Sequence, residues 1–186
     1  SPTDLIKPRL ISLQDIEPYV DFVVLMTYDY HYSGSFVTGP VAPLGGAGIY
    51  NESDTETGIE KALAVLPPTK VILGVPLYGY EWETITAHPR SAVLPGSGIV
   101  ASNRRVEEFM SQCATCSARL EDRSAESYLI YKDQETNVYH QIFYPDERST
   151  QVKVATAKQY NLAGLALWAI GYEGDTILSP IKSYLK

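Results

Sequence analysis

The sequence predicts an α/β fold built on parallel strands, and two observations support this. Near-continuous apolar runs of strand length lie at residues 21–29, 70–79 and 164–170. Such runs are typical of strands that are buried on both faces, as in parallel sheets. Helical patterns lie between the runs, which is the order expected of βαβ units. Residues 80–146 interrupt this order with an α+β pattern of their own.

The composition fits a single domain with its own core and excludes two classes of partner. The chain has 186 residues, of which 45% are hydrophobic and 20% charged. Its net charge of −7 argues against a surface for binding nucleic acid, and no stretch approaches the ~20 apolar residues of a membrane span. The first residues do not match a signal peptide, although a chain whose signal had been removed would look the same.

Two helices and a loop accompany the first apolar run. Ser12 is a suitable N-cap for a short helix over residues 12–19. A loop rich in Gly, Ser and Pro covers residues 30–51. Residues 53–56, Ser-Asp-Thr-Glu, then match a capping box, and we expect the helix that begins there to end at the proline pair 67–68.

The segment between the second and third apolar runs has a different periodicity. Apolar residues at helical spacing predict a helix that starts near Ser102. Alternating residues at 128–132 and 138–144 predict a β-hairpin. We therefore expect a small α+β insertion at 80–146, within one domain that covers residues 1–186.

The alternating order returns after this segment. A helix is expected over residues 146–160, followed by the third apolar run. Ser179 is the expected N-cap of the last helix, because Pro180 would then occupy the first helical position, where its missing N–H costs nothing. Ile181 and Leu185 are expected to face inward.

Residue parity predicts which side chains share a face, since side chains alternate along a strand. One face carries Phe22, Val24, Met26 and Tyr28, then Gly74, Pro76 and Tyr78, then Ala166 and Trp168. If this face points into a barrel, its bulk rises toward the C-terminal strand ends, where barrel active sites lie. Tyr28 and Trp168 are therefore site candidates, whereas Met26 is expected to fill a gap in a core rather than to serve the site.

Three parallel strands leave two apolar sheet edges unpaired. A (β/α)8 barrel needs eight strands and ~250 residues, and natural folds avoid long unpaired edges. We therefore expect these residues to be a piece of a larger domain, or a second chain to cover the open edges.

The ends of the strands carry recognisable motifs. Residues 25–31, Leu-Met-Thr-Tyr-Asp-Tyr-His, are followed by Gly-Pro-Val-Ala-Pro-Leu at 39–44. Residues 73–79 read Leu-Gly-Val-Pro-Leu-Tyr-Gly, and residues 164–168 read Gly-Leu-Ala-Leu-Trp. Together they resemble the sixth, seventh and eighth strands of glycoside hydrolase family 18, the chitinase family, and residues 101–168 are most similar to its spore-cortex and spore-germination branch. The resemblance implies the C-terminal portion of a TIM barrel, with the α+β insertion between the last two strands.

The same resemblance implies a reaction and a set of site residues. Family members hydrolyse β-1,4 links of N-acetylglucosamine-containing glycans, chitin-like or peptidoglycan-like, and the substrate's own acetamido oxygen attacks the anomeric carbon. Tyr28 would donate to that oxygen, Asp29 would bind the sugar, and Trp168 would form an apolar floor. Met26 and Tyr78 would complete the substrate site. Neither a metal nor a cofactor is expected, and the expected location is extracellular or at the cell envelope.

One part of the family pattern is missing from the sequence. The signature Asp-x-x-Asp-x-Asp-x-Glu, which supplies the general acid, does not occur in these residues. We therefore expect the acid to lie outside them, and these residues alone not to hydrolyse glycans. Two alternatives remain open: a non-catalytic, lectin-like glycan-binding module, and an assembly subunit whose missing strands come from another chain.

Other ionisable side chains show weaker patterns. His31 could line the cleft or serve as a hydrogen-bonded structural histidine, and no pattern surrounds His88 or His140. Four carboxylates near the strand ends are expected to be solvated loop charges. They are Glu81, Glu83, Glu173 and Asp175.

The two cysteines lie three residues apart, at Cys113 and Cys116. A zinc site would need a second pair of ligands, and a redox motif of this spacing would begin a helix rather than end one. Local packing or a local disulfide is the expected role.

Overall fold

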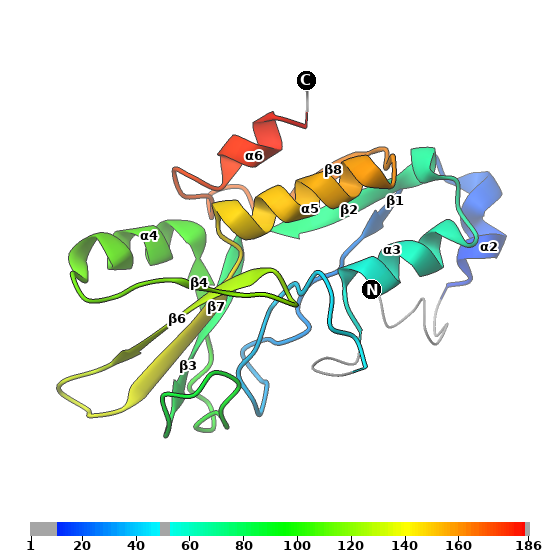
Figure 1. The fold of residues 1–186 in the computed structure, drawn as a ribbon. Coiled ribbons are helices and arrows are strands. Elements are labelled where there is room, and N and C mark those ends of the chain that lie inside the picture. The colour runs from blue at the N-terminus through cyan, green and yellow to red at the C-terminus, as the bar shows by residue number, and fades with distance from the viewer. Residues whose placement is uncertain (1–10, 49–52, 185–186) are drawn as a thin grey trace.

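Two β-sheets organise the chain (Figure 1). The structure is a computed structural model that describes residues 11–48 and 53–184. In the first sheet, β1 (Val23–Leu25) and β8 (Gly164–Trp168) flank β2 (Val71–Pro76), and both pairings are parallel. The predicted parallel arrangement of the three apolar runs is therefore confirmed, and the chain is of the α/β class.

Two of these strands are shorter than their apolar runs. β1 ends at Leu25, so Tyr28 lies beyond the ladder, and β2 ends at Pro76, which has no N–H to donate. The Tyr28 ring instead packs against Gly74. A Cβ added to Gly74 would lie 3.0 Å from a Tyr28 ring carbon and 2.7 Å from the Leu25 carbonyl oxygen. Only glycine permits this close approach.

Helices cover one face of the parallel sheet (Figure 1). They are α3 (Thr55–Leu63) and α5 (Glu147–Gln159). Their inner residues form a core with the odd-numbered strand residues: Leu25, Ile59, Ala62, Leu66, Val71, Leu73, Ala157 and Leu162. Within the described ranges, none of the helices is both long enough and apolar enough to cross a membrane.

The opposite face of the sheet carries the even-numbered residues, as parity predicts. The register places Gly74 beside Ala166 and Pro76 beside Trp168. Exposed fractions on this face are high for apolar residues, at 45% for Val24, 46% for Met26 and 60% for Trp168. Large apolar side chains thus remain in contact with solvent on this face.

A second, antiparallel sheet lies in the chain between β2 and β8, with strand order β4-β3-β7-β6-β5. Helix α4 (Asn103–Gln112) packs on one face of it through Val106, which joins the cluster of Leu129 and Ile142. β6 and β7 form the predicted hairpin. The strand bounds are Tyr78–Thr84 for β3, Ile99–Ser102 for β4, Arg119–Glu121 for β5, Glu126–Lys132 for β6 and Tyr139–Tyr144 for β7.

The helix starts agree only in part with the sequence prediction. The N-caps are Ser12 for α2 (Leu13–Ile16), Ser102 for α4 and Asp146 for α5, each accepting from a backbone N–H. Helix α3 is capped by Asp54, one residue after the predicted Ser53, and the Asp54 carboxylate accepts from the Thr57 N–H at 2.8 Å.

The last helix begins earlier than predicted. Helix α6 covers Leu178–Lys182 and its N-cap is Ile177, which makes no side-chain cap hydrogen bond, so the predicted cap at Ser179 is wrong. The Ser179 N–H instead bonds to the Thr176 carbonyl, which extends the first turn backwards. Leu185 lies outside the described residues. The described residues also form two 3-10 turns, at Glu17–Tyr19 and Pro68–Lys70.

The β3–β7 pairing depends on a close approach at Gly79. A Cβ added there would lie 1.8 Å from the Phe143 carbonyl oxygen, which is backbone and cannot move aside. We expect Gly79→Ala to lower the free energy of unfolding by about 2–3 kcal/mol through overpacking. Gly164→Ala is the control, because a Cβ at that position meets no atom within 4 Å. Urea denaturation of both variants measures the difference, and equal stability would contradict the prediction.

Candidate functional site

The residues that follow the parallel strands converge at one end of the sheet. Tyr28 and Asp29 follow β1, Tyr78 follows β2, and Trp168 is the last residue of β8. The Leu77 N–H donates to the Trp168 carbonyl oxygen at 2.7 Å, which places Trp168 beside the start of β3. Four of the five predicted site residues are therefore gathered by the strand ends themselves.

Asp29 is the polar centre of this cluster. Its Oδ1 accepts hydrogen bonds from the Tyr78 hydroxyl at 2.7 Å and from the Tyr80 hydroxyl at 3.1 Å. Its backbone has a φ of 61°, a left-handed conformation in which Asp is tolerated better than most residues. Two phenols thus fix one carboxylate oxygen, while Asp29 itself remains exposed to solvent.

Four tyrosine rings surround this carboxylate. The Tyr78 ring makes edge-to-face contacts with Tyr28, Tyr80 and Tyr172, at centroid distances of 6.4, 5.6 and 6.1 Å. This geometry is the favourable one for aromatic pairs and stabilises by about 0.5–1.5 kcal/mol each. The rings therefore form a rigid wall from β1 to the segment after β8.

The tyrosines are held in their protonated form. Burial raises the pKa of Tyr78 far above its usual value, and the hydrogen bond to Asp29 adds to this effect. Burial and the charge of Asp29 raise the pKa of Tyr80 to about 12 and also raise the pKa of Tyr28. Each hydroxyl is therefore a hydrogen-bond donor at neutral pH.

Trp168 and Met26 border the open face of the sheet. Trp168 is 60% exposed and is joined to Ala169 by a cis peptide bond. Met26 is 46% exposed on the same face, so in the described residues it does not fill a core gap. Both side chains are available to a ligand that lies over the strand ends.

The loop after Asp29 is anchored by hydrogen bonds. The His31 Nδ1 bonds to the Pro40 carbonyl oxygen at 2.8 Å, and burial lowers the pKa of its imidazole. The Tyr30 N–H donates to the Val41 carbonyl oxygen at 3.0 Å. Of the two predicted roles for His31, the structure therefore supports the hydrogen-bonded structural one. The two hydrogen bonds fold the loop back toward Tyr30.

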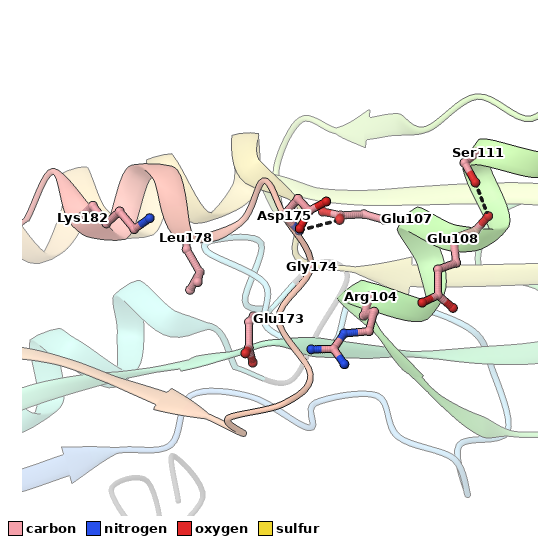
Figure 2. A pocket seen from close by; sticks show the side chains of 9 residues that line it. All are labelled: Arg104, Glu107, Glu108, Ser111, Glu173, Gly174, Asp175, Leu178 and Lys182. Carbon is pink, nitrogen blue, oxygen red and sulfur yellow. Dashed lines mark hydrogen bonds between the residues drawn. The ribbon is translucent and has the colours of Figure 1, made fainter.

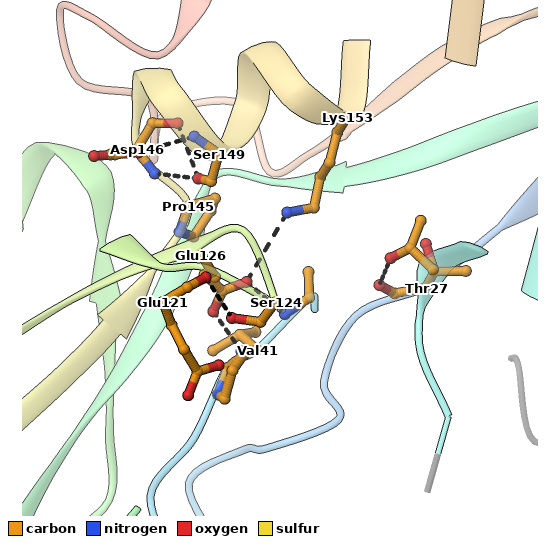
Figure 3. A network of polar contacts seen from close by, with 12 residues as sticks. Thr27, Val41, Glu121, Ser124, Glu126, Pro145, Asp146, Ser149 and Lys153 are labelled. Carbon is orange, nitrogen blue, oxygen red and sulfur yellow. Dashed lines mark hydrogen bonds and ion pairs between the residues drawn. The ribbon is translucent and has the colours of Figure 1, made fainter. Parts of the chain in front are cut away.

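A buried carboxylate holds the far side of this loop (Figure 3). Glu126, in β6, is fully buried and accepts from the Val41 N–H at 2.5 Å and the Ala42 N–H at 2.8 Å. The Nζ of Lys153, which is also buried, lies 4.0 Å from its Oε2. Burial raises the pKa of Glu126 and lowers the pKa of Lys153, whereas each partner's charge counteracts the shift.

Glu81 corrects one sequence prediction. It lies within β3 and is 3% exposed, so it is not a solvated loop charge. Its carboxylate accepts from the Tyr131 hydroxyl at 2.5 Å and bonds to the His140 Nδ1 at 2.8 Å, and it also pairs with Arg105. The expectation failed because all three partners are distant in the sequence and meet Glu81 only in the folded sheet. His140, which no pattern singled out, stacks on Tyr131.

The remaining carboxylates lie at the surface. Glu83 is half-buried in β3 rather than in a loop, and Glu173 and Asp175 lie in the loop after β8 as predicted. A cavity of about 650 Å³ lies between α4, this loop and α6 (Figure 2). Glu107 lines it and accepts from the Asp175 N–H at 2.6 Å and the Thr176 hydroxyl at 2.7 Å. The Glu107 carboxylate therefore anchors the loop that follows β8.

The cysteines form a disulfide, Cys113–Cys116, which was one of the two predicted roles. The bond closes the chain immediately after α4. Among the described residues, no group of three or more His, Cys, Asp or Glu side chains is arranged to hold a metal ion.

Sequence reasoning missed four residues of this region. Tyr80 and Tyr172 join the wall, and a signal for Tyr80 existed, because it continues the alternation of Tyr78 beyond Gly79. Glu126 and Lys153 gave no local signal, since they come from different elements and pair only through the fold.

Comparison with known proteins identifies related sequences. The family model described as "Glycosyl hydrolases family 18" matches residues 3–173. The cortical fragment-lytic enzyme of Bacillus subtilis (strain 168) is 34% identical over 158 residues, which cover 82% of this chain and 32% of that protein. A class V chitinase of Arabidopsis thaliana is 31% identical over 189 residues, covering 94% of this chain and 46% of that protein.

Solved structures show the same fold. The GH18 chitinase of Cycas revoluta in complex with (GlcNAc)3 has a TM-score of 0.78 and 28% identity, over 95% of this chain and 50% of that one. The Group IV chitinase of Ostrinia furnacalis has a TM-score of 0.79 and 22% identity, over 93% and 52%. This chain thus spans about half the length of these structures and about a third of the bacterial relative.

Proposed function

This chain belongs to the chitinase-like glycosyl hydrolases of family 18, and on that premise we propose that it supplies part of the substrate site of a glycosidase. The substrate is a glycan with β-1,4 links next to N-acetylglucosamine, chitin-like or peptidoglycan-like. The names of the relatives support this class, since they include chitinases and a cortical fragment-lytic enzyme. A solved relative with (GlcNAc)3 bound supports the sugar unit.

The observation that carries the proposal is the setting of Asp29 beside Tyr28. The two phenols on Asp29 Oδ1 fix the carboxylate and leave Tyr28 free to donate elsewhere. In substrate-assisted hydrolysis the acetamido oxygen must be bent under the sugar ring while positive charge develops. Tyr28 donates to that oxygen, and the Asp29 carboxylate stabilises the developing charge.

The other residues position the sugar. Trp168 presents its exposed ring as a floor for the apolar face of the sugar. Tyr78 acts indirectly, because its hydroxyl is used in orienting Asp29. Met26 borders the same open face. Neither metal nor redox chemistry enters this reaction.

The general acid comes from outside these residues. The sequence has no Asp-x-x-Asp-x-Asp-x-Glu run, and the surface carboxylate Glu173 has a lowered pKa because backbone N–H groups bond to it. A general acid needs the opposite shift. In this proposal β1, β2 and β8 are the sixth, seventh and eighth barrel strands, and residues 80–146 are an insertion. The remaining strands, or a second chain, cover the open edges of the parallel sheet.

A second candidate function follows from the missing signature. Without an acid, the same tyrosine wall and exposed tryptophan would make a lectin-like glycan-binding module. For either function we propose an extracellular or cell-envelope location, where such glycans occur.

A chromogenic N-acetylglucosamine oligomer tests the proposal. We expect no turnover by the 186-residue chain, and turnover by a longer form that includes the proposed upstream strands. In the longer form, Trp168→Ala should lower kcat/KM about tenfold, because the sugar loses an apolar contact worth ~1.4 kcal/mol.

The outcomes separate the two functions. Oligomer binding without turnover by the longer form favours the lectin-like module. Turnover by the short chain that disappears in Glu173→Gln would show that the acid has been misplaced. Activity unaffected by Trp168→Ala would reject the proposed sugar floor.

A further inference from the structure

A second pocket lies at the outer edge of the antiparallel sheet, away from Asp29. Its volume is about 260 Å³, and its lining includes Tyr128, Ile130 and Tyr139. We call it the edge pocket. It shares no residue with the Asp29 cluster. β5 pairs with β6 only as far as Tyr128, so the rest of β6 has no strand on its outer side within the described residues.

Two cations line this pocket. Arg119 lies opposite Tyr128 in the register, and the Lys132 Nζ lies 5.3 Å from the centre of the Tyr139 ring. Neither cation forms an ion pair within the described residues, in contrast to Arg90, which is bidentate to Glu121 at 2.8 Å. No carboxylate lines the pocket. In a chain with a net charge of −7, this is a local positive site.

The remaining walls add hydrogen-bonding groups. Thr115, which lies within the Cys113–Cys116 disulfide loop, and Ser117, which directly follows it, line the pocket. Exposed backbone groups of β6 add further donors and acceptors. Aromatic faces, hydroxyls and backbone amides together suit a sugar ring, whereas two cations that have no carboxylate partner in the described residues suit a carboxylate.

We propose that the edge pocket binds a carboxylate-bearing amino-sugar unit of a glycan. The inference rests on the proposed function only in taking a glycan as the ligand. The Arg119 guanidinium and the Lys132 ammonium bind the carboxylate, and the Tyr128 and Tyr139 faces pack on the sugar. A second binding site on one chain retains a polymeric substrate near the Asp29 cluster by raising its effective concentration.

Two probes that differ in one carboxylate test this proposal. They are N-acetylglucosaminyl-N-acetylmuramic acid, which carries a lactyl carboxylate, and N,N′-diacetylchitobiose, which does not. Titrations of the ¹⁵N-labelled 186-residue chain should shift the amide signals of Ile130 and Lys132 with the first probe. We expect the carboxylated probe to bind this pocket about five- to tenfold more tightly, and the preference to weaken at high salt.

Two double variants that remove the same charge show whether the preference comes from the edge pocket or from the net charge of the protein. Arg119→Ala with Lys132→Ala should abolish the preference. Arg104→Ala with Lys182→Ala removes the same charge from the cavity of Figure 2 and should leave the preference intact. Equal affinity for both probes, or equal loss in both double variants, would overturn the proposal.

The test is also separable from the proposed function. In Trp168→Ala, the Ile130 shifts should persist even if every response near Asp29 disappears. Shifts at Ile130 with none near Asp29 in the unmodified chain would reject the proposed function and keep the edge pocket. Shifts near Asp29 alone would do the reverse.

Discussion

Replacing Lys153 with methionine should lower the free energy of unfolding by about 3–5 kcal/mol. The change keeps most of the side-chain volume but removes the buried ammonium that pairs with the buried Glu126 carboxylate. A buried charge without its partner is strongly destabilising, and two amide N–H groups compensate for it only in part. Thermal or urea denaturation followed by circular dichroism measures the loss.

The pH dependence provides the sharper test. Without Lys153, the pKa of Glu126 in the folded protein should rise further, because the ammonium charge normally lowers it. The folded state then binds more protons than the unfolded state above pH ~4.3, so stability falls as the pH rises through the folded pKa. We therefore expect the loss in Lys153→Met to be larger at pH 8 than at pH 4.

A control of the same charge lies on the same helix. Lys158 is exposed, and its Nζ bonds to the Ser183 carbonyl oxygen at 2.8 Å. Lys158→Met should cost no more than about 1 kcal/mol at either pH. A loss in Lys153→Met that matches this control, or that does not change with pH, would contradict the assignment of a buried ion pair.

Replacing Tyr28 with phenylalanine in the longer form should lower kcat about 10²–10³-fold, with a small change in KM. The hydroxyl is proposed to donate to the acetamido oxygen and hold it beneath the anomeric carbon, and loss of this orientation slows the chemical step. Because the pKa of Tyr28 is raised, the unmodified enzyme should not lose activity through this group below pH ~10. Steady-state kinetics with a chromogenic oligomer measures both parameters.

The matched control is a tyrosine outside the site. Tyr19 is 86% exposed and ends the first 3-10 turn, so Tyr19→Phe should leave kcat unchanged. Asp29→Asn should reproduce the defect of Tyr28→Phe, because the neutral amide no longer balances developing charge. Full activity in Tyr28→Phe would place the acetamido group elsewhere.

The fold could be predicted from the sequence where the pattern is local. The prediction failed where an element's bounds depend on three-dimensional geometry. Continuous apolar runs identified three parallel strands, and the register confirmed which residues share the face of Trp168. The same runs overestimated β1 and β2, because apolar character continues beyond the ladder into Tyr28 and Tyr78. The cap of α3 moved by one residue, since Ser and Asp are both good caps and stand side by side at 53–54.

The site residues, too, were predictable only where a local pattern indicates them. Tyr28 was named from its place at a strand end, whereas Asp29 and Tyr78 came from the family resemblance. The structure joins the three through one carboxylate oxygen and one ring contact. Glu81 and Glu126 were not recognised as buried, because a charged residue is usually solvated. Their partners come from other strands and helices, and no local spacing encodes such a meeting.

The β3–β7 pairing also lowers the entropic cost of bringing β8 back to β2. About 90 residues separate the end of β2 from the start of β8, and a loop of that length carries a considerable entropic cost. Pairing of Tyr80 with Phe143 brings the entry and exit of this segment side by side. The effective loop then shrinks to the roughly 20 residues around α5, which lowers the closure cost by about 1 kcal/mol.

An order of assembly follows from this shortening. Pairing of β6 with β7 across the turn at 133–137 is local and fast, whereas parallel pairing of β8 with β2 joins strands far apart in the chain and is slow. We expect the β6–β7 hairpin, with which β3 then pairs, to form before β8 docks on β2. Extra residues in the β6–β7 turn, at 133–137, would lengthen the chain without lengthening the loop that β8 must close.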